Sequence, residues 1–232
     1  MKILALEFSS DARSVAVVES AVTGSPAGGR VSATILGRAE QLAGRETRAF
    51  ALVTTALNEA GLEREAIECV AVGLGPGSYT GIRLAIALAQ GWQLANGVRT
   101  LGLSSADVLA WRAHASGFRG PGRVLIDAQR GEFYAAPGDW REDGPVLESL
   151  RLARLEEAQA LPGRVLTGEP AVAARFPDAL VLAPDAATLG MLAAGREDSI
   201  TAAQLEPVYL RAPAFVKAPP PRVIPPLPGT PG

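Results

Sequence analysis

The sequence predicts an α/β protein built from two related halves, on three observations. Short β-rich segments alternate with helical patterns along the chain. Residues 67–74 are apolar on both alternating faces, which is typical of a central strand covered by helices on each side. The order strand, acid, turn, strand at 3–18 returns at 123–135, although a hydrophobic strand that ends in an acid is common enough to recur by coincidence.

The composition limits the class of protein. The chain has 232 residues, of which 48% are hydrophobic and 20% charged, and no apolar run approaches the ~20 residues of a membrane helix. Disordered and membrane-spanning proteins are therefore excluded, and the length suits one large or two small domains. With 22 basic and 24 acidic residues and no basic cluster, a protein that binds nucleic acid on its own is not expected.

The single cysteine and the N-terminal sequence predict a cytoplasmic protein. Cys69 has no partner for an internal disulfide, and Met1 leads directly into a strand rather than into a signal segment. No histidine or cation is near Cys69 in the sequence to activate it. We therefore interpret Cys69 as a small buried hydrophobe rather than a catalytic thiol.

The first half contains five predicted strands and two helices. Strands at 3–6, 14–18 and 31–36 are expected to be antiparallel, and they precede a helix over 47–60 that ends at Gly61. The strand at 67–74 leads into a second helix that reaches Asn96, and a further strand follows at 98–103.

The second half starts with a helix after Ser104 and continues as alternating elements. Strands are predicted at 123–127, 132–135, 164–167 and 180–182, and helices at 155–161 and 187–194. The prolines after residue 212 predict an extended tail, with a proline-motif ligand as the alternative. The expected division is therefore an N-terminal lobe over 1–103, a C-terminal lobe over 104–211 and a tail over 212–232.

The most informative segment is the glycine-rich loop at 75–83, which follows a buried strand and begins an apolar helix. This arrangement can bind an anion at the helix start, but it matches neither the P-loop nor the dinucleotide-binding pattern. A phosphate site and a tight structural turn both remain open. The helix itself has two apolar faces, one of which can cover the sheet. The face with Gly81, Ala85 and Ala89 permits a second helix to approach, either within the chain or from a partner subunit.

The loop 75–83, followed by Ala89-Gln90-Gly91, resembles the signature of the TsaB (YeaZ) family, the partner subunits of bacterial tRNA threonylcarbamoyladenosine biosynthesis. The opening strand, the turn at 127–134 and the segment 206–211 agree with the same family in order, so the resemblance covers about residues 1–217.

The resemblance implies a two-lobed actin-like ATPase (ASKHA) fold, with a mixed sheet and flanking helices in each lobe. It implies a non-catalytic scaffold and activator subunit that pairs with the metal-binding catalytic paralogue TsaD and works with the ATPase TsaE. It also implies a homodimer when the chain is alone, contact with tRNA only through the complex and no contact with a membrane. The partner-binding residues expected on this basis are Gly75, Gly77, Ser78, Tyr79, Gly81, Ile82, Ala85, Ile86 and Ala89.

Active members of this fold use an acid at each of two strand ends to hold hydrated Mg²⁺ beside the phosphates of a nucleotide. Glu7 and Asp127 occupy those positions here, but Phe8 follows Glu7 in place of a glycine that would let phosphates approach the turn. We expect no cofactor in the isolated chain and ATP or ADP at the interface of the complex. An autonomous ATPase or small-molecule kinase is the alternative.

The sequence predicts no catalytic residue and no metal site. His114 is the only histidine, so a site with two histidine ligands cannot form, and it reads as an ordinary helix-end residue. The same absence of partners argues against a peptidase, because neither His114 nor Cys69 has a catalytic neighbour in the sequence.

Overall fold

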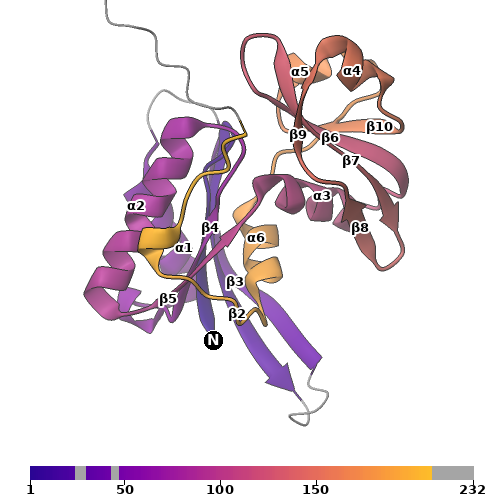
Figure 1. The fold of residues 1–232 in the computed structure, drawn as a ribbon. Coiled ribbons are helices and arrows are strands. Elements are labelled where there is room, and N and C mark those ends of the chain that lie inside the picture. The colour runs from indigo at the N-terminus through magenta and orange to yellow at the C-terminus, as the bar shows by residue number, and fades with distance from the viewer. Residues whose placement is uncertain (24–29, 43–46, 211–232) are drawn as a thin grey trace, which may run out of the picture.

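The computed structural model describes residues 1–23, 30–42 and 47–210, and its framework is two β-sheets flanked by helices (Figure 1). The first sheet has the order β3-β2-β1-β4-β5. β1 pairs antiparallel with β2, β2 antiparallel with β3, and β1, β4 and β5 are parallel. The bounds are β1 (Lys2–Glu7), β2 (Ala12–Thr23), β3 (Arg30–Leu42), β4 (Cys69–Gly73) and β5 (Arg99–Leu103).

Helices cover both faces of this sheet. On one face, α1 (Ala49–Ala60) and α2 (Tyr79–Asn96) share a core with Leu4 and Val70. On the other, α6 (Ala186–Ala193) packs on Ala5 and Cys69. Because successive residues of a strand point to opposite faces, β4 is buried throughout, which confirms the predicted central strand.

The second sheet repeats the plan of the first, with the order β11-β10-β6-β7-β8 and with β9 also paired to β7. β6 is antiparallel to β7 and parallel to β10, as β1 is to β2 and β4. The two related halves and the two-lobed actin-like fold are thereby confirmed. The bounds are β6 (Gly120–Asp127), β7 (Glu132–Arg141), β8 (Gly144–Leu147), β9 (Arg151–Arg154), β10 (Arg164–Thr167) and β11 (Leu180–Val181).

Three helices flank the second sheet. α3 (Ser105–Ala115) packs on one face with Trp140, whereas α4 (Leu155–Ala160) and α5 (Pro170–Ala173) contribute to the core on the other. Short 3-10 helices lie at η1 (Arg64–Ala66) and η2 (Ala202–Gln204). We call the first sheet with α1, α2 and α6 the first lobe, and the second sheet with α3, α4 and α5 the second lobe. No helix in the described ranges is long and apolar enough to cross a bilayer.

The helix boundaries follow the predicted signals. α1 ends at Gly61, whose φ of 64° is the left-handed conformation that closes a helix at low cost for glycine. Ser78 and Ser104 cap α2 and α3 by accepting hydrogen bonds from backbone amides of the first turn.

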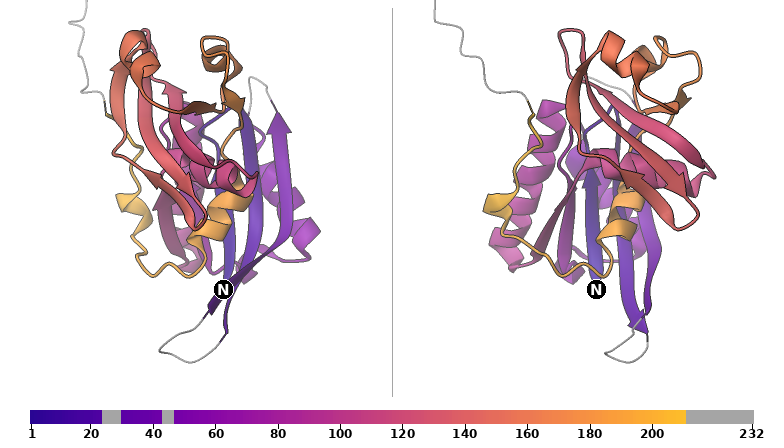
Figure 2. Two further views of the ribbon diagram at one scale, coloured as in Figure 1. Left: turned by 90° about the vertical axis from the view of Figure 1, so that its right-hand side faces the viewer. Right: turned by 45° about the vertical axis from the view of Figure 1, so that its right-hand side comes forward.

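The predicted lobe division is wrong at its C-terminal end. The chain enters the second lobe at α3, but after β11 it returns to the first lobe, as Figure 2 shows for α6 and η2. Leu189 packs on the first sheet, and Leu205 joins the core beneath α2. The stretch 186–210 therefore belongs to the first lobe, because the apolar side chains that it buries pack in that lobe's core. The predicted tail over 212–232 lies outside the described residues.

Candidate functional site

The glycine-rich loop before α2 makes close backbone contact with the turn after β1. The Ser78 amide donates to the Ser9 carbonyl oxygen at 2.7 Å. A Cβ at Gly77 would overlap that same oxygen, and one at Gly81 would overlap the carbonyl oxygen of Phe8. These two glycines thus let the start of α2 sit directly on the β1–β2 turn, which favours the structural-turn interpretation of the loop.

The predicted partner-binding side chains of α2 face the chain's own sheet. Ile82, Ala85, Ile86 and Ala89 are each less than 10% exposed and pack in the first-lobe core, and Gly81 is buried beside them. The expectation that these residues lie at the surface is therefore wrong. Small residues along this face bring the helix close to its own sheet rather than to a second helix. Gly75 is likewise buried, and Ser78 is half-buried as the cap of the helix.

The opposite face of α2 is open. Thr80, Arg83, Ala87, Gly91 and Leu94 are all exposed, and at 100° per residue they fall on one side of the helix. We call these five residues the exposed α2 face. Leu94 is 90% exposed, and a Cβ at Gly91 would meet no atom within 4 Å. This face is apolar or small along most of its length, in contrast to the usual polar outer side of a surface helix.

An aromatic cluster lies at the N-terminal end of this face. The rings of Tyr79 and Tyr209 have centroids 5.8 Å apart, and the Arg83 guanidinium lies 4.5 Å from the centroid of the Tyr79 ring. Tyr209 is held there because the Val208 amide donates to the Leu74 carbonyl oxygen at 2.8 Å. Of the predicted partner-binding side chains, only Tyr79 is exposed, at 55%.

The cluster borders a cleft of about 740 Å³ between the lobes. The first lobe contributes residues 9–11 and 77–79 together with Tyr209, and the second lobe contributes the turns at 127–131 and 168–172. Apart from Tyr209, each contributing segment follows a strand or precedes a helix, so the cleft collects the turns at one end of both sheets. Its position matches the rule that ligands of open α/β sheets bind beyond the carboxyl ends of the strands.

Asp127 lies in this cleft, as the predicted nucleotide site requires. Its carboxylate oxygens accept hydrogen bonds from the Gln129 backbone amide at 2.8 Å and from the Gln129 side chain at 3.0 Å. The turn that follows is unusual, because Gln129 and Arg130 have φ angles of 64° and 58° and precede Gly131 at 78°. Left-handed backbone at two residues with side chains is strained, and such strain concentrates at functional sites.

Glu169 is a third acid of the cleft that the sequence reasoning missed. Its carboxylate accepts a hydrogen bond from the Asp127 amide at 2.8 Å. Burial raises the pKa of Glu169 above its ordinary value, and the negative charges of Asp127 and Asp11 raise that pKa further. Its position could have revealed it, because Glu169 lies two residues after β10 and is therefore an acid at a strand end, like Asp127.

Glu7 does not reach the cleft, so its predicted role in nucleotide binding is wrong for its side chain. Glu7 is fully buried, and its carboxylate accepts hydrogen bonds from the Ser9 amide and the Ser105 hydroxyl. Burial raises the pKa of Glu7, although both hydrogen bonds oppose that change. Gly73 makes room for the carboxylate, which a Cβ at that position would overlap. Glu7 therefore links the end of β1 to the first residue of α3 inside the protein.

His114 is the helix-end residue that the sequence predicted. It lies in the last turn of α3, its Nε2 is 2.9 Å from the Arg141 carbonyl oxygen, and its ring meets Trp111 edge-on. Within the described parts of the chain, no group of three or more His, Cys, Asp or Glu side chains could hold a metal ion.

Comparison with known proteins places this chain in a family. A family model described as "TsaD: tRNA N6-adenosine threonylcarbamoyltransferase" matches residues 45–204. The tRNA threonylcarbamoyladenosine biosynthesis protein TsaB of Escherichia coli (strain K12) is 34% identical over 151 residues, which are 62% of this chain and 58% of that protein. The protein of the same name from Bacillus subtilis (strain 168) is 32% identical over 87 residues, which are 38% of this chain and 37% of that protein.

A solved structure of a similarly named protein matches more of the chain. YeaZ from Pseudomonas aeruginosa superimposes with a TM-score of 0.72 and 28% identity, over 90% of this chain and 99% of that one. The family model covers more than half of the sequence, and the three relatives named above are TsaB or YeaZ proteins. The chain belongs to the family of the tRNA N6-adenosine threonylcarbamoyltransferase TsaD, and within that family it is a TsaB (YeaZ) homologue.

Proposed function

We propose that this chain is a non-catalytic scaffold and activator subunit of the complex that makes N6-threonylcarbamoyladenosine at position 37 of tRNA, and that its exposed α2 face binds the catalytic paralogue TsaD. The observation that carries the proposal is the open, small and apolar side of α2, on a helix whose other side is fully engaged with its own sheet. The names of the relatives support the pathway.

The chemistry of the face suits a helix from another chain. Ala87 and Gly91 have no bulk that would keep a second helix axis away, and Leu94 offers a large apolar side chain to bury. The cluster of Tyr79, Tyr209 and Arg83 lies at the end of the same face, and tyrosine and arginine are enriched among the residues that dominate binding energy in interfaces.

Activation then follows from a population shift. If the competent state of TsaD binds the exposed α2 face more tightly than its other states, binding enriches that state without any reacting group from this chain. In the same proposal the complex includes the ATPase TsaE, contacts tRNA only as an assembly, and works in the cytoplasm. The isolated chain forms a homodimer through the same face and holds no cofactor, and ATP or ADP binds at the interface of the complex.

The test is tRNA nucleoside analysis in cells that depend on this chain. Ala87→Arg places a charged side chain on the exposed α2 face without touching the core, so we expect the level of N6-threonylcarbamoyladenosine to fall towards that of cells without the protein. Gln159→Arg, at a position on α4 in the second lobe that is also exposed, is the matched control. Full modification with Ala87→Arg at normal protein levels would refute the proposed surface.

A further inference from the structure

The cleft depends on how the two lobes are placed, because each lobe supplies part of its lining. Ser10 and Asp11 belong to the first lobe, whereas Asp127 and Glu169 belong to the second. Any rotation of one lobe against the other therefore changes the distances across the cleft. One contact that fixes this placement lies where α3 of the second lobe packs against α6 of the first.

The apolar part of this contact is small. Val108 is the residue of α3 that joins the first-lobe core, where it is fully buried in the cluster that contains Leu189 and Ala193 of α6. The other buried apolar residues of α3 pack in the second lobe. Apolar packing is not directional, so it brings the two helices together but sets the angle between them only weakly.

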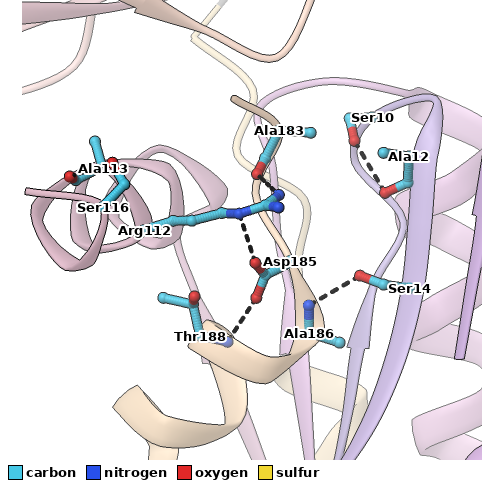
Figure 3. Close-up of polar contacts among 10 residues, drawn as sticks. All are labelled: Ser10, Ala12, Ser14, Arg112, Ala113, Ser116, Ala183, Asp185, Ala186 and Thr188. Atoms are coloured by element: carbon cyan, nitrogen blue, oxygen red, sulfur yellow. Dashed lines mark hydrogen bonds and ion pairs between the residues drawn. The ribbon is translucent and has the colours of Figure 1, made fainter. Parts of the chain in front are cut away.

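A polar contact between α3 and the segment before α6 orients the two helices relative to each other (Figure 3). The Nε of Arg112 on α3 lies 2.7 Å from Oδ2 of Asp185, and the same guanidinium donates through Nη1 to the Ala183 carbonyl oxygen. The arginine thus binds two acceptors on the segment that leads into α6. A planar guanidinium with two acceptors is held in orientation as well as in position.

Asp185 connects Arg112 to the first lobe. Its Oδ1 accepts a hydrogen bond from the Thr188 amide at 2.7 Å, so the residue is the cap of α6. The next residue, Ala186, donates its amide to the Ser14 hydroxyl on β2 at 2.9 Å. Arg112 in the second lobe is therefore connected to the first sheet through short polar contacts, and the side chains of Arg112 and Asp185 are only 31% and 22% exposed.

We propose that the pair of Arg112 and Asp185 is a latch between the lobes that sets the opening of the cleft. Asp11 of the first lobe and Glu169 of the second both line the cleft, so its opening sets how close these two acids come. Arg112 is a positioning residue in this account, because it does not line the cleft.

The experiment measures the separation of the two lobes. Spin labels at Thr55→Cys on α1, outside the exposed α2 face, and at Gln159→Cys on α4, in a Cys69→Ala background, report the separation of the lobes by double electron–electron resonance. With Arg112→Met we expect the distance distribution to broaden and its mean to lengthen. Arg141→Met is the matched control, because Arg141 pairs at 3.1 Å with Asp139 in the same lobe. We expect no change for that variant.

A second variant keeps the proposal testable if Arg112→Met does not fold. Asp185→Asn keeps a good helix cap for Thr188 but removes the charge that Arg112 binds. If Arg112→Met does not fold, Asp185→Asn is measured in its place, and the same broadening is expected. A distribution that coincides with that of the parent protein, in whichever of the two variants folds, overturns the latch.

Discussion

The Ser105 hydroxyl lies 3.2 and 3.0 Å from the two carboxylate oxygens of Glu7, at the junction between the lobes. The same hydroxyl accepts a hydrogen bond from the Gly75 amide at 3.0 Å, and the Ser105 amide donates to the Gly75 carbonyl oxygen at 2.8 Å. The acid at the end of β1, the loop before α2 and the first residue of α3 are thus joined at one buried point.

This junction predicts a pH dependence of stability. The folded-state pKa of Glu7 is raised above its ordinary value of 4.5, chiefly by burial, so folding favours the protonated form. The contribution of Glu7 to stability is complete below about pH 4.5 and is lost as the pH rises through the raised pKa. We expect the free energy of unfolding of Glu7→Gln to fall less with increasing pH over that window.

The measurement is urea unfolding at a series of pH values for both proteins. Other carboxyl groups with a raised pKa, such as Glu169, are present in both proteins, so the difference between the two curves isolates Glu7. Parallel curves would show that the carboxyl of Glu7 titrates alike in the folded and unfolded states.

Two glycines of α2 are expected to respond in opposite ways to the same substitution. A Cβ at Gly81 would overlap the Phe8 carbonyl oxygen, so Gly81→Ala forces the helix off the β1–β2 turn and costs about 1–3 kcal/mol. Gly91→Ala meets no atom and raises the helix propensity, which stabilises by up to about 1 kcal/mol. Thermal or urea unfolding of the two variants checks this, and equal effects would contradict the docking of α2 described above.

Cys69 is expected to be inert in the folded protein. It is fully buried in β4, and burial raises the pKa of its thiol to about 11. Because the thiolate is the reactive form, a thiol reagent at neutral pH should modify Cys69 only after the chain unfolds, which confines labelling to denatured protein. Mass spectrometry of native and denatured samples decides this. Rapid labelling of the native protein would mean that β4 opens.

The isolated chain is expected not to gain thermal stability from Mg·ATP. Glu7 is buried and bound to Ser9 and Ser105, so of the two acids expected to hold hydrated Mg²⁺ beside phosphates only Asp127 faces the cleft. Differential scanning fluorimetry with and without the nucleotide tests this. A rise in Tm that Asp127→Asn abolishes would support the alternative of an autonomous ATPase or kinase.

The sequence predicted most of the fold because its signals are local. The apolar run at 67–74, the cap at Ser104 and the glycine after α1 each depend on neighbouring residues, and the structure has a strand, a helix start and a helix end there. Short elements such as β8 and α5 were missed, since four residues give too little periodicity to recognise.

The free face of α2 could not be predicted in the same way. Both faces of the helix are apolar or small, and periodicity separates the faces without saying which of them meets the sheet. That choice depends on the backbone of Phe8 and Ser9, more than sixty residues earlier in the chain, which approaches Gly77 and Gly81 closely. Likewise, only tertiary packing shows that Glu7 points into the core and that 186–210 return to the first lobe.

The most direct test of the central claim is the affinity of this chain for the metal-binding paralogue TsaD of the same genome, measured by isothermal titration calorimetry. We predict saturable binding by the parent chain, a loss of at least about ten-fold in affinity for Ala87→Arg, which is about 1.4 kcal/mol, and no loss for Gln159→Arg. Equal affinities for all three proteins, or no binding by the parent chain, would contradict the account.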